Sequence, residues 1–231
     1  MLYVSHTVKG IVRVHAETVA FMIGARAGGQ SAAVSSPAGN SVDRSSASLV
    51  KILEGALRAV ETRGVHRLTM RDISEASRVS RATLYRNFST KDEVLAAVTE
   101  YICVNFEEGV RAAAAAHPDP MDRFRAVMQF FSQYARDRSP EPMLEIEPGF
   151  YLRFFRSHFG RHKAAVGAAL ALTFDHFEAA IGTPIDRMGV AEALIRMQLS
   201  TLMVPAEDDW LAIWNDSPAS VARLLALIRP S

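Results

Sequence analysis

Apolar residues recur at helical spacing from about Ser48 onward. In the first stretch they fall every three or four positions, which is the repeat of an amphipathic helix: Leu49, Ile52, Leu53, Ala56, Leu57 and Val60. Gly64 follows a last turn that contains Arg63, and a glycine after a basic last turn is a helix stop signal. The pattern therefore predicts a helix from Ser48 to Arg63.

Two short helices are predicted next, each begun by a hydroxyl residue. Thr69 is expected to cap TMRDISEAS, with Asp72 at the capping-box position in place of the usual Glu or Gln. Ser80 is expected to cap SRATLYRNF, in which Leu84 and Phe88 lie four positions apart and face inward. The remaining positions of that helix must then face outward together: Arg81, Ala82, Thr83, Tyr85, Arg86 and Asn87.

The rest of the chain also reads as helices. A long one is predicted from Lys91 to the residue before Pro118, and Gly160 is expected to break a later one. The further helices are predicted at Met121–Arg136, about Glu147–Phe159, Arg161–Ile181, Asp186–Met203 and Ser217–Ile228. No alternating strand pattern occurs, so the sequence predicts an all-α protein.

The N-terminal residues have a different composition. Residues 24–48 are rich in Gly, Ser and Ala, with almost no large apolar side chains to offset the entropy of ordering, so they are interpreted as a flexible linker. Arg13, His15 and Glu17 interrupt the apolar run ahead of it, which disfavours a signal peptide. We interpret residues 1–45 as a flexible arm or as an extension from a start codon assigned too far upstream, with Met22 as an alternative start.

Overall composition excludes several classes of protein. Of the 231 residues, 49% are hydrophobic and 22% are charged, which is typical of a globular protein. No run of about 18 apolar residues occurs, so no membrane-spanning helix is predicted. One cysteine, Cys103, can form neither an internal disulfide nor a zinc cluster, so we expect a cytoplasmic protein in which Cys103 is a small buried hydrophobe.

Positive charge is concentrated on the segment with the two short helices. From Arg44 to Lys91 there are ten basic and four acidic residues, a net charge of +6, whereas the whole chain is +1. A basic segment with helix-turn-helix spacing favours nucleic-acid binding over an ordinary solvated helix. Arg can contact guanine bidentately, Asn can contact adenine, and Thr and Ala can contact a thymine methyl group.

The stretch LTMRDISEASRVSRATLYRNFSTKDEVLAAV resembles the DNA-binding domain of the TetR family of transcriptional regulators. The resemblance covers about residues 48–100 and rests on residues at the family's spacing: Thr69, Ile73, Val79, Ser80, Leu84, Tyr85, Phe88 and Lys91. It implies a three-helix head whose third helix enters the major groove. It also implies that one group of residues reads base edges (Arg81, Ala82, Thr83, Asn87) and another holds phosphates (Thr69, Tyr85, Arg86, Lys91).

One position departs from the family pattern. The family usually has Gly in the turn where this chain has Arg78, and a non-glycine residue there is expected to need a positive φ at some cost in strain. Two alternatives stay open from sequence: Arg78 compensates by touching the DNA backbone, or the turn takes another geometry. Arg78 and Ser80 are included among the expected DNA-binding residues.

Aromatic residues are dense in the later helices. Nine of the 12 phenylalanines lie between residues 119 and 182. Any one of them reads as core, but a helical bundle lined by aromatic side chains is also a common ligand cavity, and the family resemblance implies an effector pocket here. The expected lining residues are Phe130, Phe131, Tyr134, Phe154, Phe174 and Phe177, and the expected ligand is a small apolar, lipid-like molecule.

The last two predicted helices are apolar over a wide arc, which fits deep burial or an oligomer interface. The resemblance favours a homodimer, which would place two recognition helices about one DNA turn apart, or a multiple of it, and select a palindromic operator.

The sequence contains no complete set of residues for a metal site or a catalytic triad. His158 and His162 are four positions apart, but no cysteine or paired acid completes a metal site, and Asp175 with His176 has no candidate nucleophile. No catalytic residue, metal or cofactor is therefore predicted. The sequence predicts a ligand-responsive DNA-binding repressor with a head at residues 46–92 and a helical effector and dimerisation domain at residues 93–231. The alternative is a helical small-molecule-binding protein or enzyme with a vestigial head.

Overall fold

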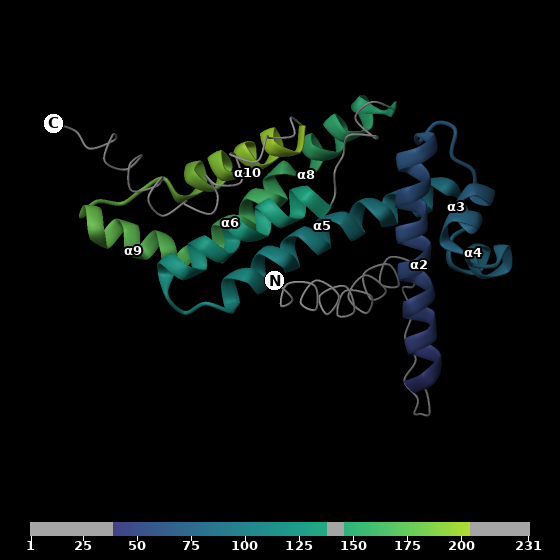
Figure 1. The fold of residues 1–231 in the computed structure, drawn as a ribbon, viewed down its shortest axis with the longest axis horizontal. Coiled ribbons are helices and arrows are strands. Elements are labelled where there is room, and N and C mark those ends of the chain that lie inside the picture. Colours follow the sequence, from purple (N-terminus) through teal and green to yellow (C-terminus); the bar gives the residue numbers. More distant parts are fainter. Residues whose placement is uncertain (1–38, 138–145, 204–231) are drawn as a thin grey trace, which may run out of the picture. The chain divides into compact units, whose positions relative to one another are not determined.

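A computed structural model describes residues 39–137 and 146–203. Within these ranges the chain is helical with no strand, as predicted. The predicted helix at Ser217–Ile228 lies outside the described residues. Contacts between Cα atoms divide the chain into two units, the first of which includes residues 39–105 and 146–154 and the second residues 106–137 and 155–203. Figure 1 shows the helices of both units.

Helix α2 is Gly39–Arg63 and supplies much of the core of the first unit. Most of its predicted apolar face is buried, at Leu49, Ile52, Leu53, Ala56 and Val60, whereas Leu57 is half-buried. Gly64 ends the helix with φ of 74°, which confirms the predicted stop.

The start of α2 corrects the interpretation of residues 39–48 as part of a linker, because the helix begins at Gly39 and not at Ser48. Residues 24–38 of the predicted linker lie outside the described residues. Once a helix is nucleated, adding one more residue costs little, so a stretch of Ser and Ala can extend it without an apolar face.

Helix α3 is Met70–Ser77 and helix α4 is Arg81–Asn87, and both pack beside α2 (Figure 1). The contact between α2 and α3 is close at Gly55, where an added Cβ atom would lie 2.3 Å from the Cα atom of Ser77. Only glycine allows the two backbones to approach in this way. Ile73, Leu84 and Phe88 fill the space beneath, each at most 3% exposed.

Helix α5, Lys91–Ala115, contributes residues to both units, because the first unit continues to Asn105 and the second begins at Phe106. Its predicted extent from Lys91 toward Pro118 is confirmed to within about one turn. Cys103 is fully buried in this helix, as expected for a small hydrophobe.

The second unit is completed by α6 (Pro120–Asp137), most of α8 (Pro148–Ala169), α9 (Ala171–Ile181) and α10 (Arg187–Met203). Helices α9 and α10 both pack against α6. The core between them contains the fully buried side chains Val127, Met128, Phe131, Val166, Leu170 and Ala191.

The predicted break at Gly160 is wrong. Helix α8 runs continuously through Gly160, and the chain instead bends by 64° between Ala169 and Ala171. A glycine inside a helix costs only about 1 kcal/mol relative to alanine, which the buried side chains around it can offset. The bend falls at Leu170, whose side chain is buried in the core of this unit.

Glu178 holds the turn between α9 and α10 by an ion pair and a backbone hydrogen bond. The Arg187 Nε atom donates to Glu178 Oε1 over 2.9 Å, and the backbone N–H of Ile185 donates to the same oxygen over 3.1 Å. These donors lower the pKa of Glu178 to about 2, the Arg187 hydrogen bond being the largest cause. The ionised Glu178 carboxylate therefore stabilises the fold fully above pH 4.5, and this stabilisation is lost as the pH falls toward 2.

Among the described residues, no single helix has the length and apolar composition needed to cross a membrane, although the bent pair α8 and α9 passes those criteria jointly.

Candidate nucleic-acid interface

The start of α3 is fixed by a reciprocal cap. Thr69 is extended, with φ of −123° and ψ of 161°, and its hydroxyl accepts a hydrogen bond from the Asp72 backbone N–H. The Thr69 backbone N–H in turn donates to Asp72 Oδ2 over 2.9 Å. The hydrogen bond from the Thr69 hydroxyl is the largest cause that lowers the pKa of Asp72. The predicted capping box is therefore confirmed, with Asp in place of Glu or Gln.

The turn between α3 and α4 has a left-handed residue. Arg78 has φ of 55° and ψ of 29°, the one positive φ at a non-glycine position in the described residues. Its backbone N–H donates to the Glu75 carbonyl over 3.3 Å, and the Ser74 hydroxyl donates to the Val79 carbonyl over 2.8 Å. The expected positive φ is thus confirmed, and hydrogen bonds on both sides of Arg78 hold the strained turn.

Helix α4 presents the face that the sequence predicts. Ser80 caps it, accepting from the Thr83 backbone N–H over 3.1 Å. Leu84 is fully buried, whereas Tyr85 is 47% exposed. Three further side chains of the predicted outward face are exposed: Arg81, Ala82 and Arg86.

Two of the predicted base-reading residues are only half-exposed. The Thr83 hydroxyl lies 2.9 Å from Ser80 Oγ, and Asn87 Nδ2 donates to the Thr83 carbonyl over 2.8 Å. The Asn87 amide keeps its second N–H and its Oδ1 atom, which are the donor and acceptor that an adenine edge requires. Its bond to the helix holds this amide in one orientation.

Lys91 is the first residue of α5 and is half-buried. Its Nζ atom donates to the Val65 carbonyl over 3.2 Å, which ties the start of α5 to the loop between α2 and α3. An ammonium group has three donors, so this bond leaves two for a phosphate oxygen.

Five of the six aromatic residues predicted to line an effector pocket pack in or against one core in the second unit. Phe130, Phe131 and Tyr134 surround Phe106, with ring centroids 5.4 to 5.9 Å from it. Phe174 and Phe177 belong to the same core, where Phe177 contacts Phe124. Phe154 is buried and belongs to the first unit.

Phe106 is the aromatic residue that the sequence analysis missed. Its ring contacts those of Phe130, Phe131 and Tyr134, and its centroid lies 4.7 Å from that of the His162 ring. It precedes the window in which phenylalanine is dense. The available signal was its spacing in α5, where Cys103, Phe106 and Val110 share one helix face.

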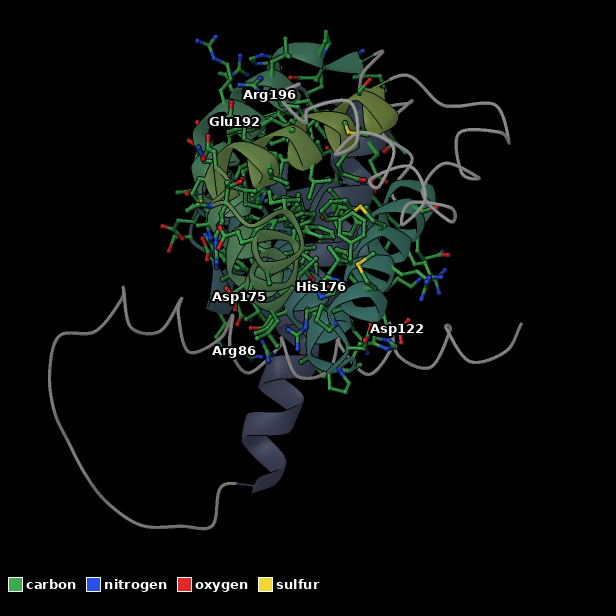
Figure 2. All side chains as sticks on the ribbon, turned by 90° about the vertical axis from the view of Figure 1, so that its left-hand side faces the viewer. Arg86, Asp122, Asp175, His176, Glu192 and Arg196 are labelled. Carbon is green, nitrogen blue, oxygen red and sulfur yellow. The ribbon has the colours of Figure 1, made fainter. Side chains whose placement is uncertain are left out.

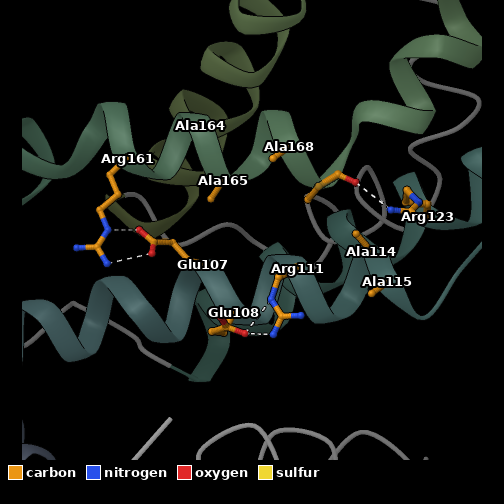
Figure 3. A pocket seen from close by; sticks show the side chains of 11 residues that line it. Glu107, Glu108, Arg111, Ala114, Ala115, Arg123, Arg161, Ala164, Ala165 and Ala168 are labelled. Carbon is orange, nitrogen blue, oxygen red and sulfur yellow. Dashed lines mark hydrogen bonds and ion pairs between the residues drawn. The ribbon is translucent and has the colours of Figure 1, made fainter. Parts of the chain in front are cut away.

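A groove of about 480 Å³ lies between α5 and α8 in the second unit. Figure 3 shows alanine side chains of α8 facing α5, with the ion pair of Arg161 and Glu107 toward one end and Arg123 toward the other. None of the six aromatic candidates lines this groove.

The residues weighed for catalysis or metal binding lie in structural or exposed positions. His162 is buried, and burial lowers its pKa to about 4. Asp175 and His176 are exposed (Figure 2). Asp175 accepts a hydrogen bond from Arg187 over 2.6 Å. In the part of the chain that the structure describes, no three His, Cys, Asp or Glu residues are grouped to hold a metal ion.

Comparison with known proteins identifies the head. Residues 52–98 match the family model of bacterial regulatory proteins of the tetR family. A stretch of 84 residues is 32% identical to the HTH-type transcriptional activator FasR of Mycolicibacterium smegmatis (strain ATCC 700084 / mc(2)155). That alignment covers 36% of this chain and 38% of the activator, so it spans well under half of either protein.

One solved structure shares the fold. SCO4454, a TetR-family transcriptional regulator from Streptomyces coelicolor, is 20% identical with a TM-score of 0.52, over 80% of this chain and 91% of that one. Apo AibR is 26% identical with a TM-score of 0.49, over 68% of this chain and 87% of the other. The match over residues 52–98, together with the capped helix-turn-helix that these residues form, identifies this segment as a helix-turn-helix head of the TetR type.

Proposed function

We propose that this protein is a ligand-responsive transcriptional repressor that binds a palindromic operator as a homodimer. The outward face of α4 is the observation that carries the proposal. Arg81, Tyr85 and Arg86 project from a short helix whose inward side is anchored by the buried Leu84. Such a helix offers donors to base edges and phosphates while its own packing keeps it rigid.

The proposed roles follow the positions of the side chains. Arg81 and Ala82 at the start of α4, with Thr83 and Asn87 beside them, read base edges. A second group holds phosphates and fixes the register of the protein on DNA: Thr69, Arg78, Ser80, Tyr85, Arg86 and Lys91.

Selection of genomic fragments on the purified protein tests this function. We expect a palindromic motif that is bound far more tightly than scrambled DNA. Arg81→Ala should cost about 1 to 3 kcal/mol on the selected motif and relax the base preference at one position. Lys91→Ala should instead weaken selected and scrambled DNA about equally. Binding without any motif would favour the alternative of a small-molecule-binding protein or enzyme with a vestigial head.

The effector is proposed to bind in the second unit, near the aromatic cluster around Phe106. Gln198 is 2% exposed, and its Nε2 atom donates to the Phe131 carbonyl over 3.0 Å. Its Oε1 atom has no hydrogen-bond partner among the described residues. An unsatisfied buried acceptor on a side chain that is bonded to the Phe131 backbone favours a small, largely apolar effector that carries one hydrogen-bond donor.

Operator release by a panel of alkanols and fatty acids tests the effector class. For a compound that releases the wild type, Gln198→Leu should raise the concentration needed about tenfold, which corresponds to about 1.4 kcal/mol. If the compound released the wild type and Gln198→Leu at the same concentration, Gln198 would not be part of the effector site.

The proposed coupling runs through α5. This helix starts at Lys91 beside the head and contains Phe106 in the aromatic cluster, so an effector that shifts the helix changes the separation of the two recognition helices of a dimer. An effector does this only if it binds one state more tightly than the other. The FasR relative is named an activator. A reporter gene that falls silent when the protein is deleted would reverse the proposed sign of regulation.

A further inference from the structure

A hollow of about 490 Å³ lies in the first unit beside the C-terminal end of α3. Three of its five lining residues are cations: Lys51, Arg58 and Arg78. We propose that this basic pocket holds a phosphate of the DNA backbone that flanks the bases read by α4. The inference rests on the proposed DNA-binding function and adds α2 to the DNA contact surface.

The close contact of α2 with α3 builds the pocket. Gly55 lies against Ser77, and Lys51 and Arg58 are four residues before and three residues after Gly55 on the same face of α2. Both cations therefore flank the end of α3, where Arg78 follows in the turn. The other two lining residues, Ala76 and Ser77, have short side chains, which leaves the space open.

Only one of the three cations, Arg58, caps the C-terminal end of α3. Arg58 Nη2 donates to the Ala76 carbonyl over 3.1 Å, which satisfies a terminal acceptor of the helix. Lys51 and Arg78 are exposed, and neither side chain has a hydrogen bond or ion pair with the described residues. Glu54, the nearest acid along α2, makes no ion pair with Lys51 or Arg58. The pocket thus keeps positive charge that the fold does not neutralise.

The backbone at Arg78 gives an independent reason to assign a role. Its φ of 55° is a conformation that glycine adopts without strain and arginine does not. No side-chain contact of Arg78 offsets that strain within the described residues. A long cationic side chain at a position where glycine would be more stable points to a ligand outside the fold.

A backbone phosphate of DNA is the anion that best fits this position. Arg78 is three residues before Arg81, the first residue of α4, so the pocket borders the helix that enters the groove. Cations beside a groove-reading helix contact phosphates and fix its register without reading sequence. Each phosphate neutralised in this way releases counterions and steepens the dependence of affinity on salt.

The experiment compares Lys51→Ala and Arg78→Gly with the wild type on the selected motif and on scrambled DNA, over a series of salt concentrations. Each variant should weaken both DNAs by the same factor and reduce the slope of log K against log salt by up to about 0.9. The preferred motif should stay the same. Arg156→Ala, which removes an exposed cation from α8, is the matched control and should leave the slope unchanged.

Arg78→Gly separates binding from folding. Glycine relieves the strained φ, so this variant should melt at a higher temperature than the wild type while it binds DNA more weakly. A merely structural role for Arg78 predicts no loss of DNA affinity, because the glycine variant folds at least as well.

The possible failures are distinguishable. Unchanged salt slopes in both variants, in a protein whose motif is lost on Arg81→Ala, would overturn the basic pocket and leave the proposed function intact. A wild type without any motif would overturn the proposed function itself. Inorganic phosphate that raises the melting temperature of the wild type but not of Lys51→Ala, with unchanged DNA slopes, would assign the pocket to a free anion and overturn the DNA contact.

Discussion

Two glycines inside helices have opposite surroundings. A Cβ atom at Gly55 would lie within 2.5 Å of three atoms of Ser77, two of them in the backbone. A Cβ atom at Gly160 would have no heavy atom within 4 Å. Helix propensity favours alanine at both positions, so the difference between them isolates the effect of packing.

We therefore expect Gly55→Ala to lower the free energy of unfolding by about 1 to 3 kcal/mol, because α3 must move away from α2. Gly160→Ala should raise it by up to about 1 kcal/mol. Urea unfolding of the two variants measures both. A stable Gly55→Ala protein with wild-type DNA affinity would contradict the close contact of α2 with α3.

The buried His162 makes a prediction about pH. Burial lowers its pKa from 6.5 to about 4, so between these values the unfolded chain binds a proton that the folded chain does not. Stability should accordingly fall as the pH decreases from 6.5 to 4, by up to about 1.4 kcal/mol per pH unit. His162→Phe should remove this part of the pH dependence in urea unfolding experiments. His176→Gln, which changes an exposed side chain, is the control and should retain it.

Residues whose roles are local could be predicted from sequence. The caps at Thr69 and Ser80 depend only on neighbours within three residues. The positive φ of Arg78 was expected from the resemblance to a family that usually has glycine at this position. Gly55 and Phe106 were missed because their roles arise from contact with helices distant in the chain. The unsatisfied oxygen of Gln198 has no sequence signal, because it depends on which side chains fail to reach it.

At the scale of elements, a stop signal fails where packing opposes it. Gly64 follows the last residue of α2, and its positive φ starts the loop that leads to α3. Gly160 has the same residue type but lies in the middle of α8, between segments that are both packed. The sequence pattern predicts a helix end at both glycines. Whether the helix ends or continues depends on the packing of the residues on either side of the glycine. Local boundaries were therefore predictable, and the long α8 was not.

The capping box of α3 makes a prediction about the head as an element. Thr69→Ala should lower the free energy of unfolding by about 0.5 to 2 kcal/mol, because the Asp72 backbone N–H loses its acceptor. Thr69→Ser keeps the hydroxyl and should behave like the wild type in thermal unfolding. If both variants were as stable as the wild type, the cap would contribute nothing to the stability of α3. DNA affinity measured on the folded variants then separates the cap from the proposed phosphate contact.

At the scale of the whole molecule, the proposed dimer predicts a fixed geometry of the operator. Met188 and Val190 are exposed apolar residues of α10, 43% and 37% exposed, on the helix where we expect association. Insertion of about five base pairs between the half-sites turns one half-site to the opposite side of the duplex. Binding should then weaken to the level of a single half-site in a mobility-shift titration.

Sedimentation at increasing protein concentration is the companion measurement. A species of twice the monomer mass, lost on Val190→Asp, supports the dimer. A monomer that binds both spacings equally would contradict it.

Helix α5 also determines how this protein can be recombined with its relatives. One helix holds the last residues of the first unit and the first residues of the second, so no loop separates Asn105 from Phe106. A chimera that joins this head to another body must therefore be spliced within a helix and keep its register. One extra residue at the junction would rotate everything beyond it by about 100°, since a turn takes about 3.6 residues. A head can therefore be exchanged only together with the first half of α5, and the number of residues in that half must stay the same.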